Sequence, residues 1–138
     1  MEPLPDVVKV ADYGIRGVHL AYELAGGGCD TLILVDATPR GGEPGTVYVI
    51  EAGGEMPASA SATDAHGLTP HAILAWLDRF GARPPRVLVV ECEPALLEES
   101  MELSQAVRAA VGEGVRVTRR LAVEAAARLQ GPEVHPCA

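Results

Sequence analysis

The chain has 138 residues, of which 48% are hydrophobic and 22% charged, a size that suits one domain built around a single core. Nineteen acidic residues against eleven Lys and Arg give a formal net charge of −8, which argues against a nucleic-acid partner because such proteins need a basic surface. No apolar run is long enough to span a membrane, no signal peptide is recognisable, and the three cysteines are odd in number. We therefore expect one cytoplasmic domain covering residues 1–138.

The first half of the chain predicts three strands and one helix. Residues 7–11 and 31–35 are continuous aliphatic runs of the kind that form strands covered on both faces. Between them, residues 16–24 are expected to form a helix that stops at a run of three glycines. Residues 45–50 follow a Gly-Gly-Glu-Pro turn and are expected to form an edge or antiparallel strand.

The second half begins with a stretch of small and polar residues, 53–65, which we expect to be a long loop. Thr69 and Pro70 are typical of a helix start, and the apolar stripe that follows predicts a helix ending at Gly81. Residues 86–90 predict another buried strand. Residues 104–129 predict a last helix, with a possible break at two internal glycines.

The alternation of strands and helices predicts an α/β fold with three layers: a mostly parallel twisted sheet with helices on both faces. In such sheets, ligands bind beyond the carboxyl ends of the strands. Acidic residues follow three of the predicted strands at this position: Asp12, Asp36 and Glu91. This shared placement is the first indication of a functional site.

Each of the first two carboxylates has a structural and a functional interpretation. Asp36 could accept hydrogen bonds from the loop that follows it, or it could bind a metal or act as a base. Asp12 could cap a helix or close a turn, or it could take part in catalysis. Spacing alone leaves both alternatives open.

Histidine near these carboxylates would favour a transition-metal site. His66 lies at the end of the long loop, just before a helix, and is the first candidate. His71, in the first turn of that helix, is the competitor, which we expect to be structural. His19 and His135 are weaker candidates because one lies inside a helix and the other in the terminal tail.

Nucleophilic and phosphate-binding mechanisms find little support. The chain has no Gly-x-Ser-x-Gly motif. Cys92 stands between Glu91 and Glu93, and these two negative charges are expected to raise the pKa of its thiol rather than activate it. The run of three glycines precedes a strand, whereas a phosphate loop follows one.

Several blocks in chain order resemble the hydrogenase maturation proteases. The blocks are Asp12-Tyr13-Gly14-Ile15-Arg16-Gly17, Leu34-Val35-Asp36-Ala37, Gly42-Glu43-Pro44-Gly45-Thr46, Asp64-Ala65-His66-Gly67-Leu68, and Val89-Val90-Glu91-Cys92-Glu93-Pro94 with Glu102-Leu103-Ser104. The resemblance spans residues 7–129. It departs from the family pattern at Ile15, where threonine is usual, and at Glu91, where glycine is usual.

The resemblance implies an endopeptidase with an α/β fold that removes a C-terminal extension from the large subunit of nickel–iron hydrogenase after nickel insertion. Asp36 and His66 correspond to two of the family's metal-binding residues, and Asp12 lies in a further acidic block. The resemblance thus assigns Asp36 and His66 to nickel carried by the substrate, and Asp12 and Asp36 to catalysis. The implied partner is the precursor of the large subunit.

The family's N-terminal Gly-x-Gly-Asn…Asp-Asp-Gly segment does not occur in residues 1–138. We therefore expect a sheet without the family's first strand and helix, with unpaired backbone groups where they would lie. The alternative function is a non-catalytic binding module that docks on a hydrogenase subunit or another partner; a flavodoxin-like ligand binder follows from fold class alone. Glu91 either supplies charge near Asp36 or pairs with an arginine, for which Arg86 and Arg116 are candidates.

Overall fold

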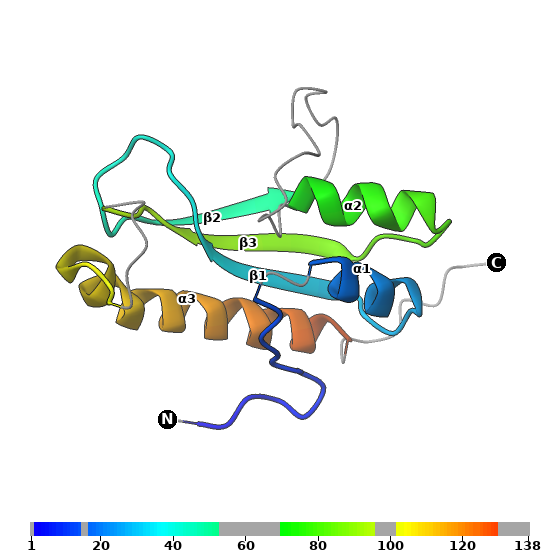
Figure 1. Ribbon diagram of the computed structural model, residues 1–138. Helices are drawn as coiled ribbons and strands as arrows, with labels where there is room; N and C mark the ends of the chain where they lie inside the picture. Colours follow the sequence, from blue (N-terminus) through cyan, green and yellow to red (C-terminus); the bar gives the residue numbers. More distant parts are fainter. Residues whose placement is uncertain (1, 15–16, 53–69, 96–101, 130–138) are drawn as a thin grey trace.

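The computed structural model describes residues 2–14, 17–52, 70–95 and 102–129 and shows a small sheet between two layers of helices (Figure 1). The elements in chain order are α1 (Gly17–Ala25), β1 (Thr31–Ala37), β2 (Val47–Ala52), α2 (Pro70–Arg79), β3 (Arg86–Cys92) and α3 (Gln105–Leu129). The predicted α/β fold with helices on both faces is confirmed. No helix among the described residues is long and apolar enough to cross a membrane.

The sheet has the strand order β1-β3-β2. β1 pairs with β3 in parallel, and β2 pairs with β3 antiparallel, as expected for residues 45–50, so the described sheet is mixed. In this register Asp36 lies beside Glu91 on one side, and Tyr48 lies beside Glu91 on the other. One row across the three strands therefore carries all three polar side chains.

The two faces of the sheet are covered by different helices. On one face, α1 and α2 contribute Leu20, Leu24, Ile73 and Leu77 to a buried cluster, against which Leu34 of β1 packs. On the other face, the long helix α3 contacts all three strands. Because side chains alternate along a strand, the row that holds Asp36 faces the same side of the sheet as Leu34.

Local sequence signals account for the helix ends. Ser104 caps α3: its Oγ accepts a hydrogen bond from the Val107 N–H at 3.3 Å. Gly81, with φ 67°, follows α2 as the predicted terminator. α3 runs without a break through Gly112 and Gly114, each of which costs about 1 kcal/mol relative to alanine, because packing along the whole sheet offsets that cost.

The strand expected at residues 7–11 is wrong: this segment has no regular structure. Val10 is 78% exposed, and the Val8 N–H donates to the Pro5 carbonyl at 2.9 Å, as part of a turn. A strand forms only where another strand accepts and donates its backbone hydrogen bonds, and no described strand lies beside this segment. Its aliphatic residues are therefore left in an irregular conformation.

No described strand pairs with the outer edge of β1. The Asp30 carbonyl accepts from the Arg86 N–H at 2.9 Å, and the Thr38 N–H donates to the Cys92 carbonyl at 3.2 Å. Even-numbered residues of this strand therefore face β3, and the backbone groups of Ile33 and Val35 point away from it, where no described strand pairs with them. Val35 is 66% exposed. Among the described residues, this edge of β1 therefore has no strand beside it.

Candidate active site

Asp36 lies next to the last residue of β1, at the carboxyl end of the parallel pair. Its Oδ1 accepts a hydrogen bond from the Ala37 N–H at 2.8 Å, whereas Oδ2 makes no hydrogen bond to the described residues. Partial desolvation raises the pKa of this carboxyl; the Ala37 N–H opposes the shift, and the nearby charge of Glu91 adds to it. Among the described residues, no group occupies the second oxygen of Asp36.

Glu91, the neighbour of Asp36 across the parallel pair, is a buried carboxylate with 5% exposure. It pairs with the guanidinium of Arg40, whose Nε–H donates to Glu91 Oε2. The expectation that Arg86 or Arg116 would be the partner is wrong, because Arg86 pairs instead with Glu51 of β2 at 2.7 Å. Glu91 thus combines the two interpretations made from the sequence: it lies beside Asp36 and it is paired with an arginine.

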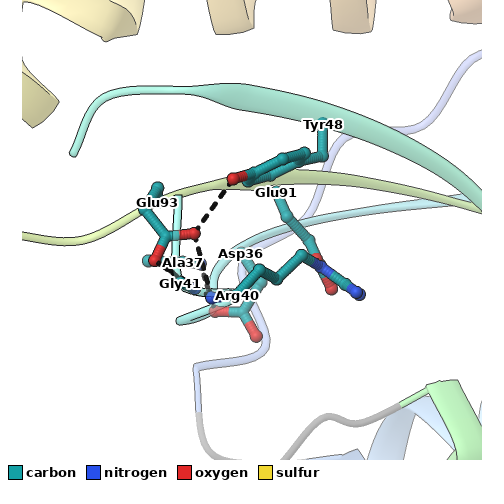
Figure 2. Close-up of polar contacts among 7 residues, drawn as sticks. All are labelled: Asp36, Ala37, Arg40, Gly41, Tyr48, Glu91 and Glu93. Atoms are coloured by element: carbon teal, nitrogen blue, oxygen red, sulfur yellow. Dashed lines mark hydrogen bonds and ion pairs between the residues drawn. The ribbon is translucent and has the colours of Figure 1, made fainter. Parts of the chain in front are cut away.

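Glu93, just after β3, organises the loop between β1 and β2 (Figure 2). Its two oxygens accept hydrogen bonds from the Arg40 N–H at 3.0 and 2.9 Å, from the Gly41 N–H at 3.1 Å, and from the Tyr48 hydroxyl at 3.2 Å. Burial opposes ionisation of this carboxyl, which is 4% exposed, but these donors together hold its pKa below the usual value. Successive backbone N–H groups that converge on one anion form a nest.

The backbone of Glu93 holds the other end of the same loop. The Gly45 N–H donates to the Glu93 carbonyl at 2.8 Å, and the Glu93 N–H donates to the Thr46 carbonyl at 2.8 Å. Two glycines make this closure possible. A Cβ at Gly42 would overlap the Tyr48 hydroxyl, and Gly45 has φ 87° with its Cβ position 2.7 Å from the Ala106 carbonyl oxygen of α3.

Cys92 lies between the two buried carboxylates in sequence. Desolvation raises the pKa of its thiol, and the charge of Glu93 raises it further. The expectation that this cysteine would not be activated is confirmed. The polar groups at this end of the sheet are therefore carboxylates, a tyrosine and an arginine rather than a nucleophilic thiolate.

The other residues expected in the site are placed as follows. Asp12 is exposed and accepts a hydrogen bond from the Gly14 N–H at 2.9 Å, as a turn acceptor would; α1 begins only at Gly17. His66 lies outside the described residues, so its approach to Asp36 stays a prediction. His71 belongs to the first turn of α2, and His19 is exposed on α1.

Within the described ranges, no group of three or more His, Cys, Asp or Glu residues is arranged to hold a metal ion. Asp36 is one carboxylate among these described residues, and its contact with a metal stays a prediction.

An apolar cavity of about 330 Å³ lies between α3 and the carboxyl ends of β1 and β3. Its walls are mostly valines, among them Val35 and Val90 of the sheet and Val111 and Val115 of α3, and it reaches Asp36 and Glu91. Thr118 and Arg119 are the polar residues that α3 adds to the wall. Because side chains alternate along a strand, the cavity lies on the α3 face of the sheet, opposite the face toward which the Asp36 side chain points.

Reasoning from the sequence did not identify Glu93, Arg40 or Tyr48 as parts of the site. Glu93 was noted as a negative charge beside Cys92 and as part of a block that resembles the family, without a role in the site. A signal was present in the loop sequence, because Gly41-Gly42 leaves backbone N–H groups uncovered and suits a nest around an anion. The identity of that anion, a glutamate 52 residues after Gly41, depends on the tertiary fold.

Comparison with known proteins places this geometry in a family. The sequence profile of the hydrogenase maturation proteases matches residues 2–119. The chain belongs to this family. It is 31% identical over 140 aligned positions to the hydrogenase expression/formation protein HupD of Rhizobium leguminosarum bv. viciae, an alignment that covers 96% of this chain and 68% of HupD.

Solved structures of similar proteins show the same architecture. The hydrogenase maturating endopeptidase HybD of Escherichia coli superposes with a TM-score of 0.65 and 27% identity, over 94% of this chain and 76% of HybD. The hydrogenase 2 maturation peptidase of the Thaumarchaeota archaeon SCGC_AB-539-E09 shares the fold, with a TM-score of 0.59 and 21% identity, over 87% of this chain and 79% of that protein. The chain thus belongs to the hydrogenase maturation proteases by sequence and shares the α/β fold of these solved structures.

Proposed function

We propose that this chain removes the C-terminal extension from the large subunit of a nickel–iron hydrogenase after nickel has been inserted. The observation that carries the proposal is the carboxylate of Asp36, which stands at the carboxyl end of β1 with one oxygen free of hydrogen bonds to the described residues. Family membership over residues 2–119 supplies the reaction class. We place this reaction in the cytoplasm, where the precursor would be processed.

In this proposal the nickel belongs to the substrate. Asp36 and His66 contact the nickel of the precursor, and the metal serves as the feature by which a loaded subunit is recognised. Contact through the metal brings the scissile bond to the strand ends, where the metal can polarise its carbonyl. Asp12 is the additional carboxylate of this aspartic-type site.

Asp36 suits proton transfer as well as metal contact. The desolvation that raises the pKa of its carboxyl brings the group closer to the range in which it can exchange a proton during hydrolysis. Arg40 neutralises the neighbouring Glu91, so that the two adjacent carboxylates do not repel a substrate carbonyl with two full charges.

The test is cleavage of a nickel-loaded precursor of the large subunit, followed by intact-protein mass spectrometry. The wild-type chain should release one C-terminal peptide. Asp36→Asn should slow the release by about 100-fold or more, as expected for loss of an acid–base group. Asp30→Asn is the matched control, because Asp30 is an exposed aspartate next to the opposite end of β1, and it should leave the rate unchanged.

The alternative function gives a different result in the same experiment. A binding module would form a complex with the precursor and leave its mass unchanged. Stable binding without peptide release, by a wild-type chain that is folded, would therefore reject the endopeptidase and favour the module.

A further inference from the structure

A chain of contacts connects the buried Glu93 to the site carboxylate Asp36 through Arg40 and Glu91 (Figure 2). We propose that Glu93 is a positioning residue for the reaction: its carboxylate fixes the loop between β1 and β2 so that Arg40 covers the charge of Glu91 beside Asp36. The effect of Glu93 on cleavage rests on the proposed function, because it assumes that the chain is an endopeptidase. The contacts themselves can be tested without a substrate.

The first step is the set of hydrogen bonds between Glu93 and the loop. Its carboxylate binds the backbone N–H of Arg40 with both oxygens and that of Gly41 with one. Charge-assisted hydrogen bonds of this kind are shorter and stronger than those between neutral groups. The backbone of Glu93 also bonds to Gly45 and Thr46, so one residue holds both ends of the loop.

The second step leads from the loop to the side chain of Arg40. Its backbone nitrogen is fixed on Glu93, and its guanidinium reaches Glu91. The hydrogen bonds from the Arg40 N–H to Glu93 therefore fix the position of the Arg40 backbone, and with it the reach of the guanidinium to Glu91. Among the described residues, Arg40 is the one cation within ion-pair distance of Glu91.

The third step is the effect on Asp36. Glu91 is buried and lies beside Asp36 in the parallel register, so without Arg40 two adjacent carboxylates would share one strand end. The orientation of Arg40, and through it Glu93, therefore sets the charge that a substrate meets at Asp36.

A double-mutant cycle tests whether Glu93 acts through Arg40. Glu93→Gln and Arg40→Gln should each lower kcat/KM for precursor cleavage by about tenfold, and the double variant should lower it no further, because residues that act through one contact are not additive. Two effects that multiply would show that Glu93 acts independently of Arg40 and would overturn the proposal. The exposed pair Glu51 and Arg86 is the control, and Glu51→Gln should leave the rate unchanged.

A second measurement does not depend on cleavage. The Arg40 Nε–H should be protected from solvent exchange in the NMR spectrum of the wild-type chain, lose that protection in Glu93→Gln, and keep it in Glu51→Gln. Should Glu93→Gln fail to fold, Tyr48→Phe removes one donor to Glu93 and should weaken the protection in part.

The two measurements separate the two proposals. A wild-type chain that leaves the precursor intact, while protection of Arg40 is lost in Glu93→Gln, overturns the proposed function and supports the contact between Glu93 and Arg40. A wild-type chain that cleaves the precursor, while Arg40 stays protected in Glu93→Gln, overturns the positioning role.

Discussion

The two edges of the sheet differ in the number of hydrogen bonds and close contacts that fix their residues. On the β2 side, Glu93 binds the loop before β2 through its side chain and its backbone, and the loop glycines fit closely against Tyr48 and α3. On the outer side of β1, the backbone of Val35 has no described strand beside it, and residues 7–11 contribute no strand at all.

The difference shows that apolar sequence alone does not make a strand. Val90 of β3 has strands on both sides and is 2% exposed, whereas Val10 has no strand beside it in the described part of the chain and is exposed. The polar residues behave in the same way: Glu93 is buried because backbone donors surround it. Long-range partners therefore decide which of two similar segments becomes ordered structure.

The largest effect is expected where the loop meets α3. Gly45→Ala should destabilise the fold by about 3 kcal/mol, because it adds a positive-φ strain of about 1 kcal/mol and a close contact with the Ala106 carbonyl. Gly27→Ala is a matched control, with a similar φ of 82° and open space around its Cβ position, and should show the strain alone. Urea unfolding measures both. Equal losses of unfolding free energy in the two variants would mean that Gly45 does not pack closely against α3.

A pair of valine substitutions compares the central strand β3 with the irregular segment 7–11. Val90→Ala should cost about 2 kcal/mol because a buried side chain is truncated. Val10→Ala should change the free energy of unfolding by no more than about 0.5 kcal/mol, since the side chain is exposed. A large loss from Val10→Ala would show that residues 7–11 are packed in solution.

The stability contributed by Glu93 should depend on pH. Because the pKa of its carboxyl is lowered in the folded chain, its ionised form stabilises the fold above the ordinary glutamate pKa of 4.5, and this contribution is lost as the pH falls through the folded value. Glu93→Gln should therefore lower the Tm at pH 7, with the difference shrinking in acid. A difference in Tm that stays constant with pH would contradict the nest around an ionised carboxylate.

The smallest effect is expected at Asp36 and has the opposite sign. Because its pKa is raised in the folded chain, the contribution of this carboxyl to stability is present below its ordinary value of 3.8 and is lost as the pH rises through the folded value. Asp36→Asn should therefore raise the Tm slightly at pH 7, with solvent screening limiting the gain. Thermal unfolding across pH checks this; a lowered Tm at pH 7 would show that the ionised carboxylate stabilises the fold.

Local signals in the sequence were sufficient for most of the fold. The position of Asp36 near a strand end, the helix over residues 104–129 and the terminator at Gly81 depend on neighbouring residues, and each was predicted. Residues 7–11 were wrongly predicted as a strand because strand formation needs a partner that the local pattern does not reveal. The pairing of Glu91 with Arg40 was missed for the same reason, since 51 residues separate the two in the chain.

The claim that Asp36 meets the nickel of the precursor has one direct test: the affinity of the chain for nickel-loaded and nickel-free precursor, measured for the wild type and for Asp36→Asn. The wild type should bind the loaded precursor at least about tenfold more tightly, a difference of about 1.4 kcal/mol, and Asp36→Asn should lose most of this preference. An Asp36→Asn variant that is folded and keeps the full preference for the loaded precursor would contradict the role of Asp36.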